Sequence, residues 1–132
     1  MTGTTHALVG AAVGALIRHP GWAFLGGVAS HAILDNLPHK DYERSAGLPL
    51  DILGLLSVLA FSISSKRPEM TAGALGGLSP DMENIVPDDN ADKAKIFPSH
   101  WFHHEDRVTD AAVLTEVLVG AAALLLLKSV SK

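Results

Sequence analysis

Residues 22–41 read "WAFLGGVASHAILDNLPHKD", an apolar run that ends in charged and imidazole side chains on either side of a proline. The pattern predicts a helix that stops near Pro38, because proline disfavours helical backbone in the residue before it. His31 and Asp35 are four residues apart and share one face of that helix. His39 continues the spacing beyond the proline. The stretch is either a set of metal ligands or the ordinary polar end of an apolar helix.

The rest of the chain repeats this pattern of apolar segments separated by polar loops. No segment alternates with a period of two over a long stretch, so we expect helices rather than strands. The 132 residues suit one domain, 1–132. The sequence therefore predicts an all-α, up-and-down bundle of about five helices, at residues 5–17, 22–37, 48–64, 69–79 and 109–128.

Two pairs of glycines stand four residues apart, Gly10 with Gly14 and Gly73 with Gly77. Within a helix, each pair lies on one face. Small residues at this spacing let two helix backbones approach closely. Each pair therefore allows another backbone to approach its helix closely.

The composition favours a membrane protein. The chain is 48% hydrophobic and 18% charged, whereas typical soluble domains are about 25% charged. Residues 48–64 and 109–128 are apolar on nearly every face and must be buried in protein or in lipid. We expect a membrane-embedded bundle with membrane lipid as its partner, and short apolar helices that suit pairing into a homo-oligomer. A compact soluble bundle is the alternative, because a straight span needs about 20 residues.

Charge and cysteine content narrow the chemistry. The net charge of −4 argues against nucleic acid as a partner. The chain has no cysteine, so any metal site must use histidine, aspartate and glutamate.

An up-and-down bundle would gather the polar residues at its two ends. One end would hold His6, residues 31–41, Asp51, residues 81–83 and residues 100–110. The other end would hold one acid, Glu69, and five basic residues: Arg18, Lys66, Arg67, Lys128 and Lys132. An excess of basic residues is typical of the cytoplasmic side of a membrane protein, so we expect the histidine-rich end on the non-cytoplasmic side.

Two further stretches carry groups that can bind metal. "GGLSPDMENIVP" (76–87) has Asp81 and Glu83 directly after a proline, although Ser-Pro-Asp is also ordinary turn chemistry. "PSHWFHHED" (98–106) contains His100, His103, His104 and Glu105, and its Trp and Phe would also suit a membrane interface. Both stretches fall at the end of the expected bundle that also holds His6.

The motifs together resemble a known family. "THALVGAAVGAL", "GGLSPDMENI" and the late histidine cluster resemble the small membrane-bound metal-dependent hydrolases of bacteria. "SHAILDNLPH" is similar to the His/Asp motif of zinc-dependent phospholipase C. The late segment lacks the His-Arg-Gly and Thr-His-Ser pattern of the membrane hydrolases, and the spacing from Asp35 to His39 is shorter than in the phospholipases. The resemblance implies an all-helical enzyme, in the bacterial inner membrane, whose metal hydrolyses phosphoesters.

We therefore expect a membrane-associated metal-dependent hydrolase that acts on a phosphoester such as a lipid headgroup. Its cofactor would be a divalent metal, first zinc, with manganese or iron as alternatives. Glu83 or Glu105 would be the general base or would hydrogen-bond to a ligating histidine. The expected metal ligands are His6, His31, Asp35, His39, Asp81, His100, His103 and His104. Two alternatives remain: a non-catalytic membrane protein with a structural metal, and a soluble bundle with a buried polar network and no metal.

Overall fold

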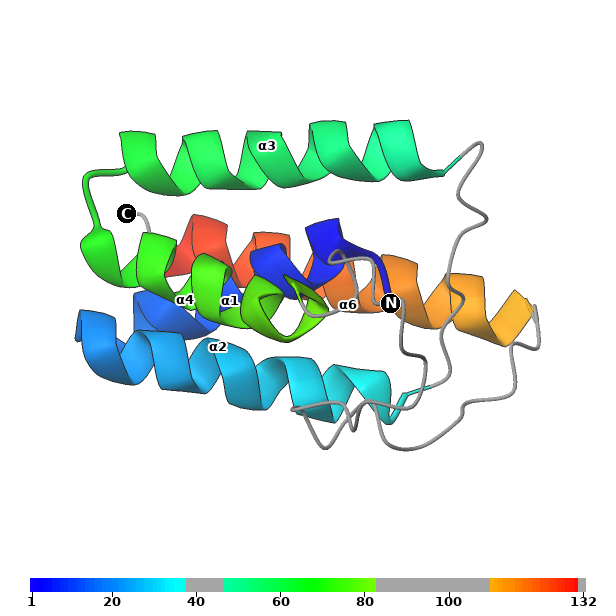
Figure 1. Ribbon diagram of the computed structural model, residues 1–132, viewed down its shortest axis with the longest axis horizontal. Coiled ribbons are helices and arrows are strands. Elements are labelled where there is room, and N and C mark those ends of the chain that lie inside the picture. Colours follow the sequence, from blue (N-terminus) through cyan, green and yellow to red (C-terminus); the bar gives the residue numbers. More distant parts are fainter. Residues whose placement is uncertain (38–46, 83–109, 131–132) are drawn as a thin grey trace, which may run out of the picture.

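The computed structural model describes residues 1–37, 47–82 and 110–130. These ranges contain no strand, and they agree with the expected helices to within two residues at every end. The all-α prediction is therefore confirmed for the described chain (Figure 1). The elements are α1 (Gly3–Ile17), α2 (Pro20–Asp35), α3 (Leu48–Ser64), α4 (Pro68–Leu78), the 3-10 helix η1 (Ser79–Asp81) and α6 (Asp110–Val130).

Local sequence explains where the helices begin. The side chain of Thr2 is the N-cap of α1 and accepts a hydrogen bond from the backbone N–H of Thr5. His19 caps α2 in the same way. Proline occupies the first turn of α2, α3 and α4, where a missing backbone N–H costs nothing because that group has no partner within the helix.

Helix α1 is the centre of the bundle. It packs against α2 and α4, which also pack against each other, and it contacts α3 and α6 on its remaining sides. In Figure 1, α3 and α2 lie on opposite sides of the molecule with α1, α4 and α6 between them. Small side chains line the core that these contacts bury, among them Ala7, Ala11, Ala15 and Ala74.

Glycines bring α1, α2 and α4 into backbone contact. A Cβ added at Gly10 would lie 2.2 Å from the carbonyl oxygen of Gly73, and one added at Gly27 would lie 2.2 Å from the same oxygen. A Cβ at Gly77 would lie 2.3 Å from the carbonyl oxygen of His6. The close approach expected of the spaced glycines is therefore confirmed, and Gly27 extends it to α2.

Contacts at the helix ends establish the direction of each helix. Asp51, in the first turn of α3, accepts hydrogen bonds from the first backbone N–H groups of α1. At the opposite end, Arg67 donates to the carbonyl oxygens of Ala15 (2.9 Å) and Val130 (3.1 Å), near the ends of α1 and α6. The helices therefore run alternately up and down, as expected.

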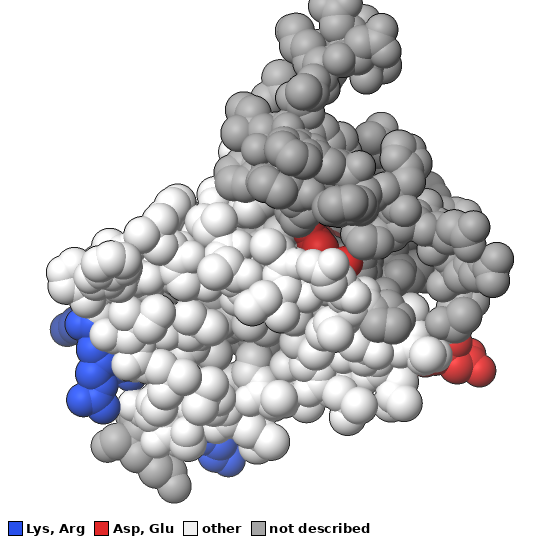
Figure 2. Space-filling model, turned by 90° about the horizontal axis from the view of Figure 1, so that it is seen from below, with Lys and Arg blue, Asp and Glu red and all other residues white. Residues whose placement is uncertain are grey.

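The described charges separate along the bundle axis, and Figure 2 shows the blue and red side chains toward opposite ends. The Arg67 end also carries the basic residues Arg18, Lys66 and Lys128. Glu69 is its one acid among the described residues, and Oε1 of Glu69 lies 2.9 Å from Nε of Arg67. A backbone hydrogen bond and the Arg67 guanidinium lower the pKa of Glu69. The acids of the other end are Asp35, Asp51, Asp81, Asp110 and Glu116.

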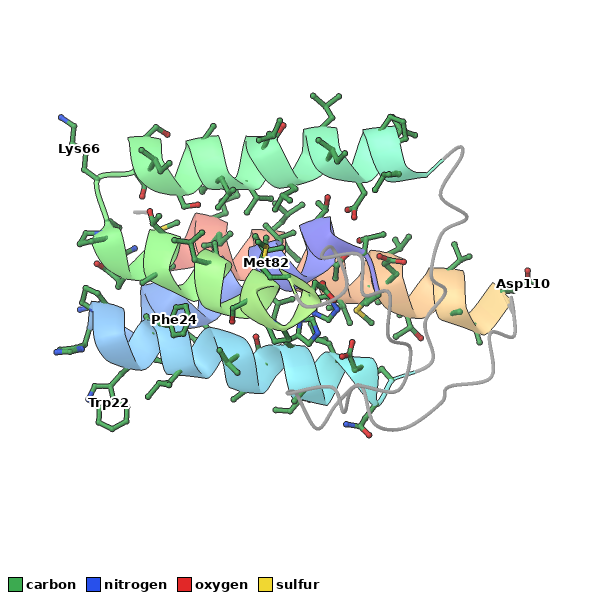
Figure 3. The ribbon with its side chains drawn as sticks, in the orientation of Figure 1. Trp22, Phe24, Lys66, Met82 and Asp110 are labelled. Atoms are coloured by element: carbon green, nitrogen blue, oxygen red, sulfur yellow. The ribbon has the colours of Figure 1, made fainter. Side chains whose placement is uncertain are left out.

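The sides of the bundle are apolar and exposed. Figure 3 shows Trp22 pointing away from the bundle, while Lys66 and Asp110 stand at opposite ends. Helix α6 is the one described helix long and apolar enough to cross a membrane, and its most apolar 18-residue stretch is only 22% buried. Exposed large side chains on the other helices include Leu25, Ile33, Leu50, Leu53, Leu56, Phe61 and Ile63.

Replacing Gly10 with alanine tests the backbone contact between α1 and α4. The new methyl group would meet the carbonyl of Gly73, so we expect Gly10→Ala to lower the free energy of unfolding by about 1–3 kcal/mol. The matched control is Gly120→Ala, where a Cβ meets nothing within 4 Å. That variant should be neutral, or stabilising by up to about 1 kcal/mol. Denaturant titrations that give the two variants equal stability would contradict the contact.

Candidate metal centre

Three of the expected ligands meet at the acidic end of the bundle. His6 lies in the first turns of α1, and His31 and Asp35 lie in the last turns of α2. All three are buried, with relative exposures of 1%, 0% and 7% respectively. The structure thus brings His6 together with two residues that follow it by 25 and 29 positions in the sequence.

The two imidazoles share one carboxylate. Nε2 of His6 lies 3.2 Å from Oδ1 of Asp35, and Nε2 of His31 lies 3.0 Å from Oδ2. The two rings are stacked, with centroids 3.8 Å apart and an angle of 20° between their planes. The Nε2 atoms of both histidines therefore converge on the same small volume beside Asp35.

A backbone contact determines which nitrogen of His31 carries a proton. Nδ1 of His31 lies 2.7 Å from the carbonyl oxygen of Gly77. A carbonyl can only accept, so Nδ1–H donates and Nε2 of the neutral ring carries a lone pair. That lone pair faces Oδ2 of Asp35 at 3.0 Å and, less closely, Oδ1 of Asp81 at 3.7 Å. Two electron-rich atoms at such a distance need a proton or a metal ion between them.

The three residues fit a metal ion. One ligand atom from each lies within 4.8 Å of the others. Ligands bound at about 2.1 Å to a tetrahedral ion are about 3.4 Å from one another, close to the 3.0 and 3.2 Å separations seen here. Two imidazoles and a carboxylate are donors that zinc, manganese and iron all accept. His6, His31 and Asp35 can therefore hold a metal ion.

Asp81 lies beside this cluster. It is the last residue of η1, the short turn that follows α4 and contains the buried Pro80. Its side chain is 32% exposed, and it approaches His31 at 3.7 Å. The compact group of three does not include it. The turn therefore positions Asp81 at the exposed edge of the cluster, and its role as a ligand stays a prediction.

The remaining expected site residues lie outside the described ranges. The expected ligands among them follow α2 or precede α6 in the chain, and the two candidate general bases are glutamates. Their roles stay predictions. These residues are His39, Glu83, His100, His103, His104 and Glu105.

Sequence reasoning missed the part that Gly77 plays in the site. The glycine spacing predicted a close approach of backbones, but no sequence signal identifies a backbone carbonyl as the acceptor for a particular histidine. His6 has no equivalent support: its Nδ1 is buried and has no hydrogen-bond partner among the described residues. The two histidines are therefore held in different ways.

Comparisons of the chain with protein-family models, with curated protein sequences and with solved structures give no match. The geometry of His6, His31 and Asp35 therefore carries the functional argument. The resemblance of the sequence motifs to membrane-bound metal-dependent hydrolases stays a prediction.

Metal analysis of the purified protein tests the cluster. We expect about one divalent metal ion per chain, and below roughly 0.2 in His31→Ala and Asp35→Ala, because each variant removes one of three ligands. His31→Gln serves as a second variant if alanine prevents folding. His19→Ala is the control, since His19 caps α2 at the far end of the bundle. Equal metal content in His31→Ala and His19→Ala would contradict the site.

Proposed function

We propose that this protein is a membrane-associated metal-dependent hydrolase that acts on a phosphoester such as a lipid headgroup. The observation that carries the proposal is the convergence of His6, His31 and Asp35 at the acidic end of an otherwise apolar bundle. Nε2 of each histidine and the Asp35 carboxylate lie within hydrogen-bond distance of one another. Two nitrogen donors and one carboxylate at that spacing are the donor set that a divalent metal ion takes.

The number of ligands supports catalysis. The described residues supply three ligand atoms to the cluster, and catalytic zinc sites have three protein ligands with the fourth position left for water or substrate. A bound divalent metal would lower the pKa of a water molecule to about 7 and polarise a phosphoryl oxygen. A phosphoester is a suitable substrate for that chemistry.

The protein's own residues orient the site and move protons. Gly77 holds the His31 ring so that Nε2 faces Asp35, which is the kind of outer hydrogen bond that fixes ligating histidines. Asp81, at the exposed edge of the cluster, lies where substrate would enter. Glu83 is two residues beyond it in the sequence, and Glu83 or Glu105 would accept the proton from the attacking water.

The surface of the bundle supports an amphiphilic substrate. The sides of the bundle expose large apolar side chains. Helix α6 has the length of a membrane span, and most of it is not buried inside the protein. Charges are confined to the two ends among the described residues. The basic end would face the cytoplasm by the positive-inside rule. The metal site would then lie toward the headgroups of the non-cytoplasmic leaflet.

A structural metal is the second candidate, and burial favours it. His6 and His31 are almost completely inaccessible, and a metal enclosed by protein ligands ties helices together without doing chemistry. His39 or a residue of the segment 100–104 would then fill the remaining position. Such a metal would hold the start of α1 and the end of α2 together. This candidate therefore predicts that the metal stabilises the fold and that the protein turns over no substrate.

A hydrolysis assay separates the two candidates. With zinc, wild-type protein in detergent should cleave bis(4-nitrophenyl) phosphate or a dispersed phospholipid, and a chelator should abolish the activity. Asp35→Asn should lower the rate at least about 100-fold, because the metal loses its carboxylate ligand. Asp110→Asn, at the same end but on the surface of α6, should leave the rate unchanged. Metal-dependent melting without turnover of either substrate would favour the structural metal.

Cell fractionation tests the membrane assignment. We expect the protein to stay in the membrane fraction through an alkaline carbonate wash and to be released by detergent, because its apolar sides need lipid. Replacing Leu118 and Leu125, both exposed on α6, with lysine should move the protein out of that fraction. Wild-type protein recovered without detergent as a stable monomer would indicate the soluble bundle instead.

A further inference from the structure

The first turn of α1 is held by two carboxylates that come from other helices. Asp51 of α3 accepts hydrogen bonds from the backbone N–H groups of Gly3 (3.0 Å) and Thr4 (2.8 Å). Glu116 of α6 accepts one from the backbone N–H of Thr2 (2.9 Å). Two negative charges therefore meet the positive end of the helix dipole, where carboxylates are most favourable.

Side-chain hydroxyls complete this contact. Glu116 also accepts hydrogen bonds from the hydroxyl groups of Thr2 and Thr5, and the Thr4 hydroxyl donates to the backbone carbonyl of Asp51. Since Thr2 caps the N–H of Thr5, the backbone N–H groups of residues 2–5 all have partners. The start of α1 is thus fixed to both α3 and α6 by several polar contacts.

His6 is the next residue of the same turn. The ring of His31 is held through Nδ1 by Gly77, whereas Nδ1 of His6 has no hydrogen-bond partner among the described residues. Ligating histidines usually owe their orientation to such a partner. The position of Nε2 of His6 therefore depends on the backbone of α1, and that backbone is held by Asp51 and Glu116.

Glu116 lies on a helix that is otherwise largely apolar. It occupies α6, which is long and apolar enough to cross a membrane and packs Ala123 and Leu127 into the core. Ionisable groups in such helices are rare and are generally functional. The contacts of Glu116 with Thr2 and Thr5 give it a specific task at the start of α1.

We propose that Asp51 and Glu116 are positioning residues for the metal centre: they fix the first turn of α1 and thereby hold Nε2 of His6 beside Asp35. This inference rests on the proposed metal site. Asp51 and Glu116 do not themselves belong to the cluster of ligands. Their removal should therefore weaken metal binding without removing a ligand.

The experiment measures zinc affinity of the full-length protein by competition with a chelator. Asp51→Asn turns one of the two acceptors into a donor that faces a backbone N–H, and Glu116→Gln removes the charge. We expect each variant to raise the Kd for zinc by roughly tenfold or more, as for other outer contacts of metal ligands. The Co²⁺-loaded variants should also show shifted absorption bands, because the geometry at His6 has changed.

Two controls separate positioning from general stability. Asp110→Asn removes a carboxylate at the same end that faces the surface, and its Kd should equal that of wild type. Leu55→Ala weakens the packing of α3 on the core and removes none of the hydrogen bonds between Asp51 and the start of α1. It should lower the melting temperature and leave the Co²⁺ spectrum unchanged.

The outcomes distinguish this inference from the proposed function. If wild type binds zinc and both carboxylate variants bind it within about twofold of wild type, well short of the usual outer-contact effect, the positioning role is wrong and the metal site stands. If Leu55→Ala weakens zinc binding as much as Asp51→Asn does, the carboxylates only stabilise the fold. If wild type binds no zinc, the proposed metal centre fails and the positioning role fails with it.

Discussion

The absence of a side chain at Gly77 is the constraint on which the site depends. A Cβ there would lie 2.3 Å from the carbonyl oxygen of His6, so any other residue would push α1 away from α4. The carbonyl of Gly77 itself accepts the hydrogen bond from His31. One backbone position thus sets the distance to the helix that carries His6 and the orientation of the ring in α2. The contacts of Gly10 and Gly27 with Gly73 extend the same close packing along the bundle.

This packing buries the Asp35 carboxylate beside two imidazoles. Within the described ranges, five acids lie toward one end of the bundle: Asp35, Asp51, Asp81, Asp110 and Glu116. The lysines and arginines of these ranges lie at the other end. Among the described residues, the groups beside Asp35 are the two imidazoles. A positive charge there can come from protonation of an imidazole or, in the proposed function, from a bound cation. With Nδ1 of His31 donating to Gly77, both possibilities place the positive charge at Nε2, between the histidines and the carboxylate.

The acids at this end perform two tasks. Asp35, with Asp81 beside it, faces the imidazoles, while Asp51 and Glu116 face the backbone N–H groups at the start of α1. The two sets act on the same helix, because α1 carries His6 immediately after the turn that the second set holds. Three helices other than α1 and α4 therefore contribute to placing one imidazole. The apolar sides of those helices remain exposed, which suits a bundle surrounded by lipid.

Much of the fold follows from the sequence, because helix formation and helix ends depend on nearby residues. Apolar segments bounded by proline and polar loops predicted the helices to within two residues, and alternating directions predicted which residues would share an end. The pairing of His31 with Asp35 also follows from local geometry, since residues four apart lie on one helix face. Spaced glycines at 10, 14, 73 and 77 indicated a close approach of two backbones.

Tertiary structure decided which groups meet. Helices that are apolar on nearly every face carry little information about their rotation or axial offset, so the sequence does not determine which side chains face a neighbour. The stacking of His6 on His31 and the hydrogen bond from His31 to Gly77 depend on that offset. So does the use of Asp51 and Glu116 at the start of α1. The sequence by itself determined the helices and the polarity of their ends. The close packing of α1, α2 and α4 through their glycines then brought three residues of one polar end into a cluster that can hold a metal.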